Sequence, residues 1–468
     1  MPPGIALVLC ALFVLLIFRL ASEKTRGASP SLWIPTIWIL YCASRPVGAW
    51  LHPDSSGGQP AEEGSAVDRV LLCIFIAIGC LILKNRNLNW AKVFRDNRWL
   101  VLLCGYMAMS IVWSDYNFVS LKRWFRFCAT PLMALIVLTE SSPREAMEKV
   151  FRRTAYLWLP VSLLLIKYYP DLGMQYDLWT GERMWVGVTT QKNGLGRLCL
   201  ISAFFLVWAI IRAWSQRKQT GVKWRIRTDV AVLLLALLLL RGPGGAYSAT
   251  SIVALLLGTT MYLGLLWMRK LKSNTGVTVL MIVIGISIFL GIVIPIIGGS
   301  GASGFAAILG RDATFTGRTD IWQAILPVAL RNSVLGVGYG SFWIKPPISY
   351  NLFIMVNEAH NGYLDVFVEL GLVGLILFLG FLLSSCRAAQ RALAVDFEWA
   401  GFVLCFLLVI VIHNITESSF LRPTNHMGAT LFFLAMLIHR LRKAGVAPGR
   451  NARSAEIIGA TPFGQEYR

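Results

Sequence analysis

Long apolar stretches separated by short polar connections run through nearly the whole chain. A helix needs about 20 apolar residues to cross the hydrocarbon of a bilayer, and stretches near this length recur up to residue 439. We therefore expect an all-α polytopic membrane protein with about 12–13 transmembrane helices. The predicted spans are residues 4–21, 31–51, 67–83, 99–113, 124–139, 154–169, 194–211, 229–241, 247–268, 277–298, 364–384, 399–413 and 427–439. Residues 4–21 lack the basic start and the cleavage site of a signal peptide, so we interpret them as a retained helix.

Composition supports the membrane interpretation. The chain has 468 residues, of which 56% are hydrophobic and 15% are charged, against about 25% charged in soluble domains. An ordinary soluble enzyme and a disordered chain are thereby excluded. The nine cysteines lie in or beside apolar segments and form no CxxC pair, so neither a disulfide framework nor a zinc site is expected.

The net charge of +20 predicts the orientation. Lys and Arg collect in alternate connections and in the C-terminal tail, and cytoplasmic connections are enriched in these residues. The C-terminus is then predicted inside and the N-terminus outside. Because orientation accounts for the excess charge, no nucleic-acid partner is expected.

One external connection, residues 299–363, is much longer than the others. It holds Trp322, Trp343 and several isoleucines, and long loops of this kind are usually functional or disordered. We expect an ordered external loop that carries the site, inserted in a single transmembrane catalytic domain at residues 1–439. Residues 440–468 are predicted to form a disordered cytoplasmic tail.

Several Lys and Arg residues lie on the predicted outer side, although such residues usually collect in cytoplasmic connections. Such charges at membrane depth are costly and usually mark a substrate path or a pairing. The external face is therefore cationic, which favours an anionic ligand. These Lys and Arg residues include Lys122, Arg123, Arg126, Arg183, Lys192, Arg197, Arg241, Arg311, Arg318, Arg331, Lys345 and Arg422.

Arg318 precedes a stretch of helical periodicity, residues 321–329, with Thr319 or Asp320 as a plausible N-cap. A guanidinium beside a helix N-terminus suits a phosphate group. The alternative is that Arg318 pairs with Asp312 or Asp320 and only orders the loop.

His360 lies where the long loop re-enters the membrane. Its imidazole can accept a proton near neutral pH. The alternative is a histidine that caps the next helix or hydrogen-bonds at the interface. Lys192 and Arg197 lie at the external mouth of another predicted span, and the alternative for Lys192 is interfacial snorkelling.

Four motifs between residues 310 and 374 resemble the signature region of the O-antigen ligase and polysaccharide polymerase superfamily. They are residues 317–322 (GRTDIW), 335–340 (LGVGYG), 359–364 (AHNGYL) and 369–374 (ELGLVG). Two upstream patches also fit, residues 113–115 (WSD) with 120–123 (SLKR), and residues 191–196 (QKNGLG). The resemblance covers about residues 110–375.

The resemblance implies a bacterial inner-membrane glycosyltransferase of GT-C-like architecture. Such enzymes transfer a glycan from undecaprenyl diphosphate at the periplasmic face, with inversion and without a metal or other cofactor. Their partners are the lipid-linked donor, a glycan or lipid-linked acceptor and the bilayer, and a chain-length co-polymerase is a further candidate. By match, Arg318 contacts the diphosphate and His360 acts on the acceptor hydroxyl. Further candidate substrate contacts are Arg311, Lys192, Arg197 and Arg123.

Ligases of this superfamily tend to have an arginine near the position of Lys192. The lysine, with the Arg311 and Arg318 pair, favours an exopolysaccharide or O-antigen polymerase over a ligase. Asp312 and Asp320 are isolated, and no DxD-like metal site occurs in an external loop. A transporter or flippase is less favoured, because no matching pair of broken helices is evident.

Overall fold

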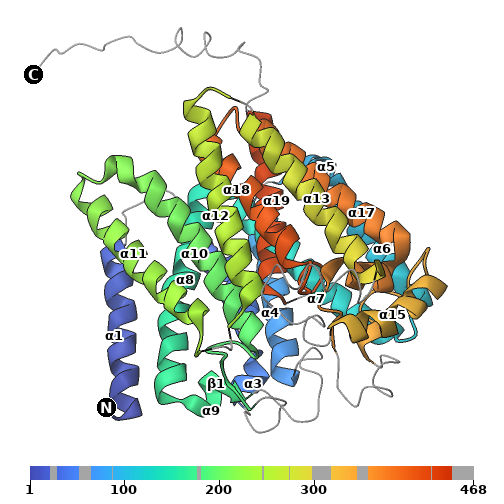
Figure 1. Ribbon diagram of the computed structural model, residues 1–468, viewed down its shortest axis with the longest axis horizontal. Coiled ribbons are helices and arrows are strands. Elements are labelled where there is room, and N and C mark those ends of the chain that lie inside the picture. Colours follow the sequence, from blue (N-terminus) through green and yellow to red (C-terminus); the bar gives the residue numbers. More distant parts are fainter. Residues whose placement is uncertain are drawn as a thin grey trace, which may run out of the picture.

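The computed structural model describes residues 1–21, 29–51, 65–86, 88–176, 181–244, 247–273, 275–297, 318–344, 357–422 and 424–444 (Figure 1). Its α-helices in chain order are α1 (Pro3–Ala21), α2 (Trp33–Cys42), α3 (Val47–Leu51), α4 (Ala66–Lys84), α5 (Trp90–Asp96), α6 (Arg98–Ser110), α7 (Asn117–Leu138), α8 (Pro143–Tyr168), α9 (Pro170–Gly173), α10 (Lys192–Ala213), α11 (Thr220–Arg241), α12 (Ala249–Lys270), α13 (Thr275–Ile297), α15 (Arg318–Arg331), α17 (Gly362–Ala392), α18 (Phe397–His413) and α19 (His426–Ala444). Short 3-10 turns are η1 (Pro30–Leu32), η3 (Ile111–Trp113), η4 (Trp214–Gln216) and η5 (Phe342–Ile344).

The predicted all-α polytopic architecture is confirmed. Each of the thirteen predicted spans coincides with helix, although residues 31–51 are divided into α2 and α3 by a turn before Pro46. Among the described residues, six helices are long and apolar enough to cross a membrane: α1, α4, α10, α12, α13 and α17. Three further apolar helical stretches are shorter, at Pro30–Cys42, Arg98–Trp113 and Phe397–His413.

The centre of the molecule consists of α10, α18 and α19, whose side chains are buried along most of their lengths. In Figure 1, α18 and α19 lie in the middle of the bundle, with α1 at one edge and α6, α15 and α17 at the other. Aromatic rings fill the contact between α10 and α18, where Phe204 stacks on Phe402 with 5.4 Å between ring centroids. A small hairpin, β1 (Met174–Tyr176) and β2 (Arg183–Trp185), pairs antiparallel with Met174 opposite Trp185.

Helix α17 is broken in its interior at Gly371, whose backbone lies at φ 63° and ψ −164°. Buried backbone groups need partners, and the segment after α15 supplies them. The N–H of Leu372 donates to Ser333 O at 2.7 Å, and the N–H of Gly338 donates to Glu369 O at 2.9 Å. A Cβ on Gly371 would lie 2.3 Å from Val334 O, so the close approach requires glycine here. The motifs at 335–340 and 369–374 therefore form one unit.

The predicted external loop is described in part. Residues 298–317 and 345–356 lie outside the described residues, and with them Arg311, Asp312 and Lys345. Between them lie α15 and the turn η5. The predicted N-cap at Thr319 or Asp320 is wrong, since α15 begins at Arg318 and both residues belong to its first turn. The predicted tail is described only as far as residue 444.

Candidate active site

Four helix N-termini meet at one end of the bundle, those of α10, α15, α17 and α19. The described residues of the connection between α18 and α19, 414–422 and 424–425, lie among them. Its Asn414 accepts from the N–H of Gly362 at 2.9 Å, and its Glu417 contacts side chains of α10 and α15. Helix N-termini carry free N–H groups and the positive end of the helix dipole. This end of the molecule is therefore suited to an anion.

Glu417 connects the groups that the sequence singled out separately. Its Oε1 accepts from Arg318 Nη2 at 2.6 Å and from Asn193 Nδ2 at 2.7 Å. Its Oε2 lies 3.6 Å from Arg197 Nη1 and 4.0 Å from His360 Nδ1. Glu417 is buried, so its charge is compensated by these cations rather than by water. Among the described residues, Arg318 pairs with Glu417, from a segment 99 residues away, and not with Asp320. The other half of that alternative, a pair with Asp312, lies outside the described residues.

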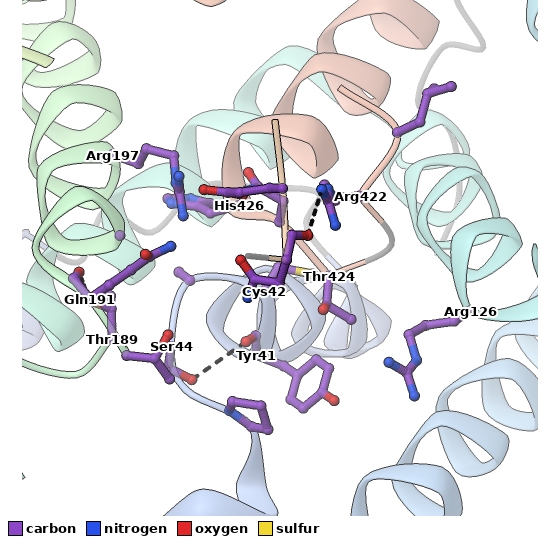
Figure 2. Close-up of a pocket in the computed structure, with 18 of the residues that line it drawn as sticks. Tyr41, Cys42, Ser44, Arg126, Thr189, Gln191, Arg197, Arg422, Thr424 and His426 are labelled. Atoms are coloured by element: carbon purple, nitrogen blue, oxygen red, sulfur yellow. Dashed lines mark hydrogen bonds between the residues drawn. The ribbon is translucent and has the colours of Figure 1, made fainter. Parts of the chain in front are cut away.

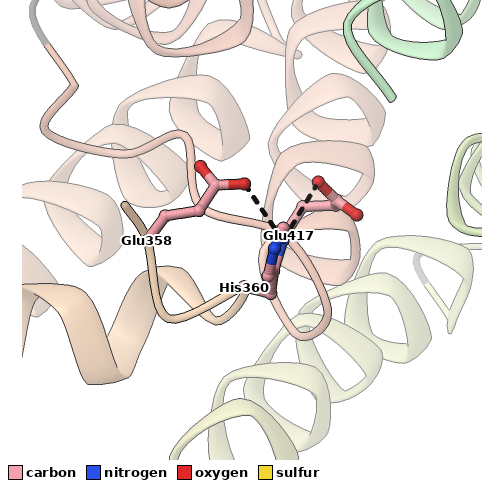
Figure 3. Close-up of side chains that lie close together, drawn as sticks. All are labelled: Glu358, His360 and Glu417. Carbon is pink, nitrogen blue, oxygen red and sulfur yellow. Dashed lines mark ion pairs between the residues drawn. The ribbon is translucent and has the colours of Figure 1, made fainter. Parts of the chain in front are cut away.

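His360 lies between two carboxylates (Figure 3). Its Nδ1 is 3.0 Å from Glu358 Oε1, and Glu417 lies beyond. Burial alone would lower the pKa of the imidazole, but the negative charges of Glu358 and Glu417 outweigh it, so the pKa of His360 is raised. Burial likewise opposes ionisation of Glu358, yet His360 and the arginines Arg422 and Arg197 lower its pKa. The charges of Glu358 and His360 therefore stabilise each other in this buried position.

The backbone of His360 is itself unusual, with φ at 49°, in the left-handed region that residues other than glycine seldom adopt. The next residue fixes it there. Asn361 is the N-cap of α17, and its side chain accepts from Leu364 N and donates to Gly291 O and Ile415 O. The alternative in which His360 caps α17 is therefore wrong. Strained residues gather at functional sites, so the backbone at His360 supports a functional role for this residue.

The motifs also meet at Trp322, on the buried face of α15. Its Nε1 donates to Ala359 O at 2.8 Å, which joins the motif at 317–322 to the motif at 359–364. Arg318, one turn earlier on the same helix, is buried as well. The indole contact thus fixes the distance between the Arg318 segment and the His360 segment.

A cavity of about 180 Å³ adjoins this cluster, and Glu358 and Arg197 belong to both. Figure 2 shows Arg126, Arg197 and Arg422 among the residues that line it. Four arginines line it, Arg123, Arg126, Arg197 and Arg422, against the two carboxylates Glu358 and Glu369. Arg123 donates to Gly340 O at 2.6 Å. Arg422 donates to Asn357 O and to Asp365, both at 3.1 Å. The cavity is therefore positively charged overall.

Some polar atoms in this region have no hydrogen-bond partner among the described residues. They include Arg197 Nη1 and both ring nitrogens of His426, a buried residue that lines the cavity. Buried polar atoms normally find partners, so these atoms indicate a place where a ligand binds.

Of the predicted site residues, the structure brings together Arg318, His360 and Arg197, and places Arg123 on the adjoining cavity. Lys192 lies elsewhere, in a small cavity with Trp185, Leu239 and Tyr247. Glu417 and Glu358 were missed by the sequence analysis. The signal for Glu417 was a carboxylate directly after the apolar stretch 399–413, in a chain with only 24 Asp and Glu.

One cluster here has the composition of a metal site. Ligand atoms of Glu358, His360 and Glu417 lie within 4.8 Å of one another, a cluster that the absence of a DxD-like motif in the sequence does not reveal. Arg318 and Arg197 already pair with Glu417. Two guanidinium groups this close oppose the entry of a divalent cation.

The comparisons with known proteins agree with the motifs. Residues 230–379, about a third of the chain, match the family model described as O-antigen ligase. The exopolysaccharide production protein ExoQ of Rhizobium meliloti is 26% identical over 360 residues, which are 74% of this chain and 78% of the relative. These similarities support the resemblance of the chain to the O-antigen ligase and polysaccharide polymerase superfamily. Together with the long apolar helices, they support a multi-pass membrane protein of O-antigen or exopolysaccharide synthesis.

Proposed function

We propose that the protein is an inverting glycosyltransferase that polymerises lipid-linked repeat units. The donor is a glycan on undecaprenyl diphosphate, and the acceptor is a sugar hydroxyl of a second lipid-linked glycan. The observation that carries the proposal is the meeting of Arg318, Arg197 and His360 around the buried Glu417, beside an arginine-lined cavity. A cationic site next to a histidine suits the departure of a diphosphate and the activation of a hydroxyl.

In the proposed reaction, His360 takes the proton of the acceptor hydroxyl while the hydroxyl oxygen attacks the anomeric carbon. The bond between that carbon and the diphosphate oxygen breaks, and the electron pair leaves with the diphosphate. Arg318 and Arg197 stabilise the charge that develops on the leaving group, as preorganised cations do in other enzymes. Glu358 stabilises the imidazolium that forms on His360, at 3.0 Å.

The role of Glu358 predicts a change in pH dependence. The base acts when His360 is neutral, so activity is lost as pH falls through its pKa, which the carboxylates raise above the ordinary value. Glu358→Gln removes one of these charges, so the pKa falls and the acid limb of the rate profile moves to lower pH. Initial rates of polymer formation between pH 5 and pH 9 measure the shift.

Glu398→Gln is the matched control, because Glu398 is a partly exposed carboxylate at the opposite end of α18. Its acid limb is expected to coincide with that of the wild type. If the limb of Glu358→Gln also coincided, the titrating group would not be His360.

The cations also predict that the reaction needs no metal, because Arg318 and Arg197 occupy the place of a charge-neutralising divalent ion. Activity with purified enzyme and lipid-linked donor is expected to persist in excess EDTA. Loss of activity that Mg²⁺ or Mn²⁺ restores would instead assign Glu358, His360 and Glu417 as metal ligands.

The similarity to an exopolysaccharide production protein supports a polymerase, and the family description as O-antigen ligase keeps a ligase as the second candidate. A deletion strain separates them. Loss of polymer with single repeat units still attached to lipid A–core indicates a polymerase. Undecaprenyl-linked polymer that no longer reaches lipid A–core indicates a ligase.

We further propose an orientation in the bacterial inner membrane, with the site periplasmic and the C-terminus cytoplasmic. The alternation of Lys and Arg along the chain supports it. A chain-length co-polymerase is proposed as a partner, because the products of such a reaction need a limit on their length.

A further inference from the structure

A second cavity, of about 410 Å³, lies at the other end of the bundle, between α6 and α17. The site lies at the N-terminus of α17, whereas this cavity lies along its last four turns. Three arginines line it, Arg98, Arg387 and Arg391, and no carboxylate does. None of the three forms an ion pair with an acidic side chain of the described residues. The proposed glycosyl transfer makes no use of this cavity.

The lining residues of α17 follow one face of the helix. The apolar part comes first, with Ile376, Leu379 and Leu383, and Arg387 and Arg391 follow at the C-terminal end. Steps of three and four residues keep side chains on one helical face, and 15 residues at 1.5 Å each extend over roughly 22 Å. The groove thus changes from apolar to cationic along the axis of a membrane-spanning helix.

Exposure shows which part of the groove meets lipid. Ile376 and Leu383 are exposed apolar side chains on a helix long enough to cross a membrane. Trp99 forms the opposite wall, packed against Gly380 so closely that a Cβ there would lie 2.4 Å from the indole. Acyl chains of the bilayer are therefore the natural neighbours of the apolar part.

The cationic end lies at headgroup depth. Directly before Arg98, the short helix α5 buries none of its side chains and exposes Trp90 and Phe94 beside Lys92 and Arg95. Exposed aromatic rings next to cations are typical of the membrane–water interface. The first turn of α6 also receives no side-chain cap, so its N-terminal dipole adds to the positive charge.

We infer that this groove binds one anionic phospholipid, with the phosphodiester at Arg98, Arg387 and Arg391 and an acyl chain along Ile376, Leu379 and Leu383. Charge complementarity selects an anionic lipid over a zwitterionic one. The apolar part of the groove favours a phospholipid over free phosphate, because inorganic phosphate makes no favourable contact with apolar side chains. The lipid packs against α17 beyond its break and so stabilises the helix that carries the His360 loop at its other end.

The test is native mass spectrometry of the full chain in neutral detergent, titrated with phosphatidylglycerol or with phosphatidylcholine of the same acyl chains. One retained phosphatidylglycerol per chain is expected, bound more tightly than phosphatidylcholine. Each interfacial arginine is expected to contribute about fivefold in affinity. The triple variant Arg98→Gln, Arg387→Gln, Arg391→Gln should therefore lose roughly 100-fold for phosphatidylglycerol and little for phosphatidylcholine.

The matched control is Lys218→Gln, Lys270→Gln, Lys272→Gln, which removes three exposed cations from the same end of the bundle. It should bind phosphatidylglycerol as the wild type does. Should the triple arginine variant not fold, Arg387→Gln alone is expected to lose about fivefold. Equal binding of the two lipids, an equal loss in the lysine control, or displacement of phosphatidylglycerol by inorganic phosphate would overturn the inference.

Discussion

Replacing His360 by alanine is expected to abolish polymer formation while the protein is still made and inserted. The acceptor hydroxyl is a weak nucleophile until its proton is removed, and removing a general base typically costs 10²–10⁴-fold. Because the pKa of His360 is raised, the effect is greatest at alkaline pH, above that pKa, where the wild-type imidazole is neutral. Initial rates with purified enzyme and lipid-linked donor at that pH measure the loss.

The left-handed backbone at His360 requires a control for strain. Glycine adopts this φ freely, so His360→Gly separates loss of the imidazole from distortion of the loop, and added imidazole is expected to restore part of its activity. His360→Gln hydrogen-bonds but accepts no proton, so it should behave like the alanine variant. His439→Gln, at the far end of α19, should keep full activity. Near wild-type rates for His360→Gln would instead make His360 a positioning residue.

Replacing Arg318 is expected to have an effect of similar size. Its guanidinium is buried and donates to Glu417 Oε1 at 2.6 Å, which fixes it beside Arg197. Arg318→Ala removes a cation from the leaving group, and losing one preorganised donor typically costs about 10²–10³-fold. Arg318→Lys keeps the charge but loses the planar fork, so we expect a steep fall in kcat/KM for this variant too. The measurement is steady-state transfer from the lipid-linked donor.

Inorganic pyrophosphate distinguishes a diphosphate contact from a structural one. It is expected to inhibit the wild type and to inhibit Arg318→Lys much less. Arg331→Lys is the control, since Arg331 is an exposed residue at the other end of the same helix. Equal inhibition of wild type and Arg318→Lys, or normal polymer in cells carrying Arg318→Ala, would contradict the assignment.

The helices were predictable because the bilayer requires long apolar stretches, and the pattern from α1 to α19 is dominated by this requirement. The division of residues 31–51 into two helices was harder to predict, since only the short interruption Ser44, Arg45 and Pro46 marks it in a mainly apolar stretch. The break in α17 depends on Gly371, which has a positive φ and lies directly against Val334 O. The sequence alone does not show this contact, so it does not show that the position requires glycine. Tertiary contacts of this kind leave no local pattern in the sequence.

Within the site, Arg318 and His360 were found because each lies in a motif. Glu417 lies in none, and its importance comes from three cationic neighbours that are distant in sequence. Lys192 was grouped with Arg197 because both lie near the start of one predicted span. The helix begins at Lys192, and five residues at 100° each place the two side chains about 140° apart around the axis. Arg197 therefore reaches Glu417, whereas Lys192 faces another cavity.

The distribution of the site over the chain limits how such enzymes can be recombined. The stretch that matches the family model, residues 230–379, carries Arg318 and His360 but neither Glu417 nor Arg197. A chimaera that exchanges this stretch between relatives would combine Arg318 and His360 from one protein with Glu417 from the other. The glutamate would then lie among side chains with which it does not normally pack. The smallest exchangeable unit therefore includes α10 and the connection after α18, and transplanting specificity means moving nearly the whole bundle.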